Sequence, residues 1–279
     1  MEISLSSPAT SIASDRFGHQ IAISTKDNNI SIFSAQNSSL MATIPIQTST
    51  PNSLSFSSNE FGPQLAVGLS NGQIRVFSRV SSNSYKEIPQ KIEFSHRGSV
   101  SCVSFHPSMC CVASGSLDGT FAVHSFVEGK WKTVAIPASL LGITAIDWSA
   151  DSAEALSMQT LFVGGADGTI KIWRSSLGSD SWENIAKAQV HEGWVRRISS
   201  PSFVSGGTLK VGSVGDDFYA AVLKFNGKEV TLSKSSRLHC QATGVSWAMV
   251  DKTLVLSHID GKTTMWKENE NGTLTIVEE

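Results

Sequence analysis

Short runs of alternating apolar and polar residues, each closed by a turn, recur along the whole chain of 279 residues. Apolar and polar residues alternate in the segments 73–77 (QIRVF) and 169–173 (TIKIW), which is the two-residue period of a half-buried strand. No window of comparable length has the 3.6-residue period of an amphipathic helix. The pattern therefore predicts an all-β chain.

The strands belong to a repeat that occurs six times. Each copy has an acidic or amide residue in a hairpin turn, six positions before the end of the second strand, and successive turn residues are 44 to 49 residues apart. This spacing is close to the roughly 40–45 residues of a four-stranded propeller blade. In four copies the turn residue precedes a glycine, a dipeptide that tolerates positive φ in a tight hairpin. The six turn residues are Asp27, Asn71, Asp118, Asp167, Asp216 and Asp260.

Six repeats of four strands fill the chain and predict a six-bladed β-propeller in a single domain, residues 1–279. We expect the blades at residues 8–46, 52–94, 98–136, 142–188, 193–235 and 242–277. The first blade starts near Ala9 and the last blade supplies its own outer strand at 274–277. No strand is left over to join the two ends of the ring.

Two hypotheses account for this lack of a closing strand. Either the terminal blades pack directly against each other, with residues 2–5 forming a short extra strand at most, or the ring stays open. An open ring leaves an apolar flank on each terminal blade, a surface that a partner's strand or blade would cover. The residue pattern alone favours neither hypothesis.

Several stretches resemble a known family. They are the run 162–174 (FVGGADGTIKIWR), then Ser181-Trp182-Glu183, the start His191-Glu192-Gly193-Trp194-Val195-Arg196, and the run 260–268 (DGKTTMWKE). The chain resembles WD-repeat proteins throughout, and in these stretches the small WD-repeat subunit of the outer cage of the COPII vesicle coat, which also serves in the Y-shaped scaffold of the nuclear pore.

The resemblance implies an open six-bladed WD-repeat propeller whose gap is filled by a seventh blade from a larger partner. That partner would be the rod-forming subunit of the coat cage, or an α-solenoid nucleoporin at the pore. The implied location is cytoplasmic, peripheral at the endoplasmic reticulum membrane and COPII vesicles, and also the nuclear pore. Candidate contacts on the terminal blades are Ile21, Ile23, Ile30, Ile32, Leu254, Leu256 and Met265, although each taken singly is more typical of packing between neighbouring blades.

The family's buried network of His, Ser or Thr, Asp and Trp is incomplete in this chain. The third blade has His96, Ser114 and Asp118, but His124 stands where Trp is expected. We expect such losses to loosen individual blades without changing the fold. The fifth blade offers His191, Ser213 and Asp216 with Val222, and the fourth offers Asp167 and Trp173 without the leading His.

Composition and charge narrow the function further. Lys and Arg total 22 against 24 Asp and Glu, so the clustered positive charge of a nucleic-acid binder is not expected. No stretch approaches the roughly 18 apolar residues of a membrane span, and the N-terminus does not resemble a secretory signal. We therefore expect no nucleic-acid partner, no direct insertion into a membrane, and unpaired cysteines.

No pattern of catalytic or metal-binding residues stands out. Cys102, His106, Cys110 and Cys111 lie close in sequence but lack a C-x-x-C spacing, and small buried hydrophobic residues are the favoured interpretation. We expect no metal, no cofactor and no enzymatic activity. The favoured function is a structural scaffold in coat and pore, and the alternative is a self-closed WD-repeat adaptor that binds peptides on its top surface.

Overall fold

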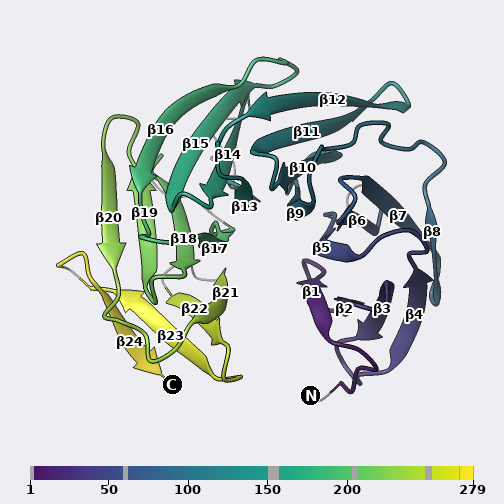
Figure 1. Ribbon diagram of the computed structural model, residues 1–279, viewed down its shortest axis with the longest axis horizontal. Coiled ribbons are helices and arrows are strands. Elements are labelled where there is room, and N and C mark those ends of the chain that lie inside the picture. Colours follow the sequence, from purple (N-terminus) through teal and green to yellow (C-terminus); the bar gives the residue numbers. More distant parts are fainter. Residues whose placement is uncertain are drawn as a thin grey trace. The chain divides into compact units, whose positions relative to one another are not determined.

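The computed structural model describes residues 3–58, 62–149, 157–202, 207–248, 253–269 and 271–278. The described residues form six antiparallel sheets of four strands each. The packing of the chain divides it into two compact units, Met1–Leu140 and Leu141–Glu279, with three sheets in each (Figure 1). Among the described residues, no helix has the length and hydropathy needed to cross a bilayer.

The first unit contains sheets β1–β4, β5–β8 and β9–β12. Their strands are β1 (Ala9–Ser14), β2 (Gln20–Thr25), β3 (Asn29–Ser34), β4 (Leu40–Pro45), β5 (Pro51–Phe56), β6 (Gln64–Leu69), β7 (Ile74–Ser81), β8 (Ser84–Glu87), β9 (Val100–Phe105), β10 (Cys111–Ser116), β11 (Thr120–Val127) and β12 (Lys130–Pro137).

The second unit contains sheets β13–β16, β17–β20 and β21–β24. Their strands are β13 (Ile143–Trp148), β14 (Met158–Gly165), β15 (Thr169–Ser176), β16 (Glu183–Gln189), β17 (Val195–Ser199), β18 (Leu209–Gly215), β19 (Ala220–Phe225), β20 (Val230–Lys234), β21 (Ala242–Trp247), β22 (Thr253–His258), β23 (Thr263–Glu268) and β24 (Leu274–Glu278).

All six sheets repeat one topology. In each, the four strands pair in chain order, and the ladder between the first and second strands has a register shift near the second strand's end. Such a β-bulge bends a strand and increases its twist. In the first unit β5 lies beside both β1 and β9, and in the second unit β17 lies beside both β13 and β21 (Figure 1). The first strands of successive blades therefore adjoin within each unit.

Glycines permit this close approach between neighbouring blades. A Cβ at Gly68 would lie 2.5 Å from Cγ1 of Val100, the first residue of β9, and a Cβ at the equivalent Gly164 would lie 2.8 Å from Cγ1 of Val195, which starts β17. Neither distance is compatible with a side chain at these positions, because protein interiors are close-packed. The two glycines thus allow the next blade to pack directly on the second strand of the preceding blade.

The sequence prediction of an all-β chain with six four-stranded blades is confirmed. An open ring and a blade donated by a partner stay predictions, as does the grouping of residues 1–279 into a single domain. Of the hypothetical closing strand at residues 2–5, residue 2 lies outside the described residues, and residues 3–5 form no strand.

Candidate functional site

The first sheet has two faces of different character. Ala22, Ile30 and Ile32 are fully buried and belong to one apolar cluster with Leu65 and Val67 of β6. This face therefore packs on the second sheet of the same unit. Because side chains alternate along a strand, the neighbouring residues lie on the opposite face.

That opposite face, which we call the outward face of the first sheet, is apolar and half exposed. The strand register pairs Ile12 with Ile23, Ile21 with Phe33, and Phe33 with Leu40, so these side chains share one face. Ile12 is 67% exposed and Leu40 is 57% exposed, while Ile21 is intermediate and Ile23 and Phe33 are buried. Ile12 lies in the middle of β1 and Leu40 at the start of β4, so the exposed apolar side chains of this face lie on both edge strands of the sheet.

The last sheet repeats this arrangement. Leu254, Leu256 and Trp266 are buried in a cluster with Val214 and Val222 of the preceding sheet. On the opposite face, the outward face of the last sheet, Val255 lies directly across from Met265 in the ladder between β22 and β23. Val255 is partly buried and Met265 is 37% exposed.

The structure separates the candidate partner contacts into two groups. Met265 and Ile21 reach the surface, whereas Ile23, Ile30, Ile32, Leu254 and Leu256 are at most 6% exposed. Ile30, Ile32, Leu254 and Leu256 belong to core clusters and provide contacts within the chain. Ile23 is buried too, but it lies on the outward face of the first sheet. Ile12, Leu40 and Val255 were missed in the sequence, since an alternating pattern shows that a strand has two faces but not which one a neighbouring sheet covers.

One predicted turn residue was wrong by a single position. In the fifth blade the residue equivalent to Asp118 and Asp167 is Asp217, not Asp216, because Val214 pairs with Ala220 where Gly164 pairs with Ile170. The following residue, Phe218, has a φ of 66° and replaces the glycine of other blades. Two adjacent aspartates and a non-glycine turn concealed the register in the sequence.

The partners of these two aspartates agree with the corrected register. Asp217 Oδ1 lies 2.9 Å from Nδ1 of the buried His191, and His191 Nε2 lies 2.9 Å from Ser213 Oγ. Burial alone would raise the pKa of Asp217, but its hydrogen bonds, chiefly that with His191, hold it below its ordinary value. Asp216 instead forms an ion pair with the half-exposed Arg196. The register also puts Leu223, not Val222, at the fourth position of this network.

The third blade carries a longer polar network than its sequence suggested. His96 Nε2 lies 2.8 Å from Ser114 Oγ, which lies 2.9 Å from Nε2 of His124, and Nδ1 of His124 lies 2.9 Å from Thr133 Oγ1. At the other end, the Thr120 hydroxyl donates to Asp118 over 2.6 Å. His124 thus replaces Trp as a network member and links it to the outer strand β12.

Burial keeps the imidazoles of this network neutral. His124 is fully buried, and burial, with a smaller contribution from His96, lowers its pKa to about 3. Burial also lowers the pKa of His96, although Asp118 opposes the shift. Neutral, fully engaged histidines are typical of structural networks, and these side chains offer no open approach to a substrate.

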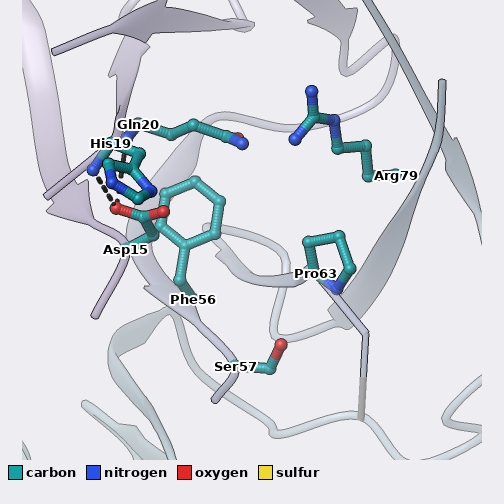
Figure 2. A pocket seen from close by; sticks show the side chains of 7 residues that line it. All are labelled: Asp15, His19, Gln20, Phe56, Ser57, Pro63 and Arg79. Carbon is teal, nitrogen blue, oxygen red and sulfur yellow. Dashed lines mark hydrogen bonds between the residues drawn. The ribbon is translucent and has the colours of Figure 1, made fainter. Parts of the chain in front are cut away.

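Figure 2 shows a small pocket in the first unit, lined by side chains of the first two sheets. The carboxylate of Asp15 accepts hydrogen bonds from the backbone N–H groups of His19 and Gln20, over 2.6 and 3.1 Å, and Arg79 lies across the pocket from them. Its volume is about 160 Å³, below the roughly 300–1,000 Å³ of small-molecule sites. The full lining is Asp15, His19, Gln20, Phe56, Ser57, Pro63 and Arg79.

A larger hollow of about 430 Å³ lies at the turns of the fifth blade. Asp216 and Asp217 line it, together with Arg237 and Tyr219. Both carboxylates already have partners within the chain, in Arg196 and His191. The hollow therefore lies on the turn side of the fifth blade.

The four cysteines are free thiols. Cys102 and Cys111 are buried, and burial raises the pKa of the Cys111 thiol to about 12. A protonated, buried thiol behaves as a small hydrophobic residue. This agrees with the interpretation of Cys102 and Cys111 as small buried hydrophobic residues, whereas Cys110 is only partly buried.

Comparison with known proteins indicates the class of protein that these blades resemble. The family model of the WD domain, G-beta repeat, matches residues 89–125 and 135–174. The third and fourth blades are thus similar to WD repeats, and the common topology of the six blades agrees with that similarity.

Within that class, the chain is similar to SEC13 proteins. It is 26% identical over 197 residues to the "Protein SEC13 homolog" of Drosophila melanogaster, covering 64% of this chain and 54% of the relative. It is 28% identical over 191 residues to the "Protein transport protein sec13" of Aspergillus clavatus, covering 63% and 64%. The human "Protein SEC13 homolog" is 24% identical over 174 residues, covering 57% and 54%. The chain is thus similar to SEC13 proteins over part of its length, and it spans about half to two thirds of the length of the curated relatives that it matches.

Proposed function

We propose that this chain is a non-enzymatic scaffold subunit that acts in protein transport, as part of a COPII-type outer cage between endoplasmic reticulum and Golgi. We extend the proposal to a scaffold role at the nuclear pore. The similarity to proteins named as protein transport proteins supports the general role. The proposed location follows from that role: the cytoplasmic face of the endoplasmic reticulum and its vesicles, and the nuclear pore.

The mechanism we propose is that a larger partner donates a blade whose strands cover the outward faces of the first and last sheets. The observation that carries this proposal is the exposure of Ile12, Leu40 and Met265, which are 67%, 57% and 37% exposed. These fractions together equal about one and a half side chains, so covering them contributes roughly 2–5 kcal/mol. The partner's strands would add backbone pairing at the sheet edges.

The partner is proposed to be the rod-forming subunit of the cage, or an α-solenoid nucleoporin at the pore. Covering two apolar faces with one inserted blade would fix the terminal sheets to the partner's rod. This converts a joint between two chains into a rigid element, which is the mechanical property that a cage or pore scaffold requires.

The alternative function is an adaptor that closes on itself and binds a peptide at the turn side of its blades. The hollow beside Asp216 and Asp217 favours this alternative, because its arginine and tyrosine offer contacts to an extended peptide. In that case the chain alone would be a stable monomer without need of a donated blade.

The test is co-expression with the N-terminal, blade-forming segment of the rod subunit from the same organism. We expect a complex of equal stoichiometry on size-exclusion chromatography, and a higher Tm than that of the chain alone, since a ligand that binds only the folded state stabilises it. A chain that is equally stable alone and forms no complex would contradict the scaffold function and favour the adaptor.

Matched variants locate the contact. Ile12→Glu places a charge on the outward face of the first sheet, and Val80→Glu places one at the end of β7, where Val80 is 56% exposed. We expect Ile12→Glu to abolish the complex and Val80→Glu to retain it, with both variants folded by circular dichroism. The variants Ile32→Glu and Leu254→Glu would not test the partner contact. Both residues are buried in core clusters, and a buried charge would unfold the blade.

A further inference from the structure

Three side chains with metal-binding atoms meet at one end of the last sheet. His239 and Cys240 lie in the connection between β20 and β21, and His258 is the last residue of β22. One ligand atom from each lies within 4.8 Å of the other two. All three belong to the second unit, and no motif in the sequence joins them, because His258 follows Cys240 by 18 positions.

The hydrogen bonds of the two imidazoles leave the same ring atom for a further ligand. Nε2 of His239 lies 3.0 Å from Oδ2 of Asp260, and Nε2 of His258 lies 2.8 Å from Oγ1 of Thr264. His258 is only 4% exposed. Its Nδ1 atom is buried and makes no hydrogen bond of good geometry in the described part of the chain, although the backbone of Cys240 lies close to the ring. A buried ring nitrogen in this condition is costly unless something binds it.

Charges around the cluster suit a cation. The ring centroids of His239 and His258 are 4.7 Å apart, and Oδ2 of Asp260 lies 3.0 Å from Nε2 of His239. The cluster therefore combines two imidazoles and a thiol with an adjacent carboxyl group.

We propose that His239, Cys240 and His258 form a zinc site, with Asp260 as the residue that orients His239. Two imidazoles and a thiolate are ligands that Zn²⁺ prefers, and a carboxylate on the far nitrogen of a ligating histidine is the usual outer-shell partner. From bond lengths near 2.0–2.3 Å, ligand atoms of a tetrahedral zinc lie roughly 3.3–3.6 Å apart. The cluster must close by about 1 Å, through the exposed His239 and the partly exposed Cys240. A water molecule takes the fourth position.

Binding changes the protonation of the site in a defined way. The S–H bond of Cys240 breaks, a Zn–S bond forms with the electron pair left on sulfur, and the proton passes to the buffer. The carboxylate of Asp260 accepts a hydrogen bond from the Nε2–H group of His239, which leaves the lone pair of Nδ1 for the metal. The ion would tie the β20–β21 connection to the end of β22 and stiffen the last sheet.

The site is tested on the purified, chelator-treated chain with Zn²⁺ by calorimetry and with Co²⁺ by absorption. We expect one ion per chain, release of one proton per zinc, and a cobalt spectrum with a thiolate charge-transfer band. Cys240→Ser should remove that band, and Cys240→Ser and His239→Gln should each weaken zinc binding by at least about tenfold. Asp260→Asn should weaken it by roughly 10–100-fold, as expected of an outer-shell partner.

Matched controls are Cys110→Ser, which removes another partly exposed thiol, and His19→Gln, which removes another exposed imidazole. Both should bind zinc like the unaltered chain. The proposal is overturned if the chain binds no stoichiometric zinc at micromolar concentrations, or if Cys240→Ser and His239→Gln bind it as tightly as the controls do. Folding of each variant is verified by circular dichroism, so that a loss of binding is not a loss of structure.

Discussion

Acid is expected to destabilise the third sheet through its buried histidines, and His124→Gln is the perturbation that isolates the effect. His124 is fully buried and its pKa is lowered to about 3 by burial, with a contribution from His96. His106 is 1% exposed and burial lowers its pKa to about 4. In the unfolded chain both imidazoles regain an ordinary pKa near 6.5.

The direction of the effect follows from which state takes up the proton. Below about pH 6.5 the unfolded chain binds a proton at each histidine while the folded chain does not, so stability is lost as the pH falls towards the folded pKa. Lowering the pH from about 7 to about 5 therefore reduces the free energy of unfolding by roughly 2 kcal/mol for each histidine, or about 4 kcal/mol for both. That is a large share of a total stability of about 5–15 kcal/mol.

The assay is urea unfolding followed by tryptophan fluorescence at both pH values. His124→Gln keeps an amide that can hydrogen-bond to Ser114 and Thr133 but removes the titratable imidazole. On acidification we therefore expect the free energy of unfolding of this variant to fall by about 2 kcal/mol less than that of the unaltered chain. His19→Gln, which removes an exposed imidazole, is the matched control. Equal acid losses in His124→Gln and the unaltered chain would refute this explanation.

Two further predictions concern the turns. Gly261→Ala should reduce stability by about 1–3 kcal/mol for its left-handed backbone alone, since a Cβ there meets nothing within 4 Å. Gly168→Ala should reduce stability more, because its Cβ would lie 2.1 Å from the carbonyl oxygen of His191. Equal losses of stability for the two variants in thermal unfolding would contradict the clash. Asp217→Ala should cost about 1–3 kcal/mol by leaving Nδ1 of the buried His191 unpaired. Asp216→Ala should cost less, about 1 kcal/mol, because it removes a partly exposed ion pair with Arg196 and a hydrogen bond from Gln241. The reverse order in urea unfolding would restore Asp216 as the network residue.

The blade architecture could be predicted because its signals are local. Turn dipeptides such as Asn71-Gly72 and the alternation of Ile170 and Ile172 each report on a few neighbouring residues, and the six repeats reinforce one another. The same reliance on local signals led to the error in the fifth blade. There Phe218 adopts positive φ without glycine, and only the strand pairing shows that Asp217 occupies the turn.

Contacts between distant segments could not be predicted in the same way. Leu254 and Val255 look equally suited to an interface in the sequence, and their opposite faces are distinguished only by the sheet that buries Leu254. The link from His124 to Thr133 was hidden because His stands at a position where the family has Trp. His258 meets His239 and Cys240 only because a hairpin and a connection end at the same place.

The most direct test of the scaffold function is thiol labelling of the two outward faces with and without the rod subunit's N-terminal segment. Ile12→Cys and Met265→Cys place a reactive thiol on each face, and Val80→Cys provides one at a similarly exposed position elsewhere. Mass spectrometry separates these thiols from the native cysteines. A donated blade predicts that adding the segment slows labelling at 12 and 265 and leaves 80 unchanged. If the complex forms and positions 12 and 265 still react at their original rates, the outward faces are not where the partner binds.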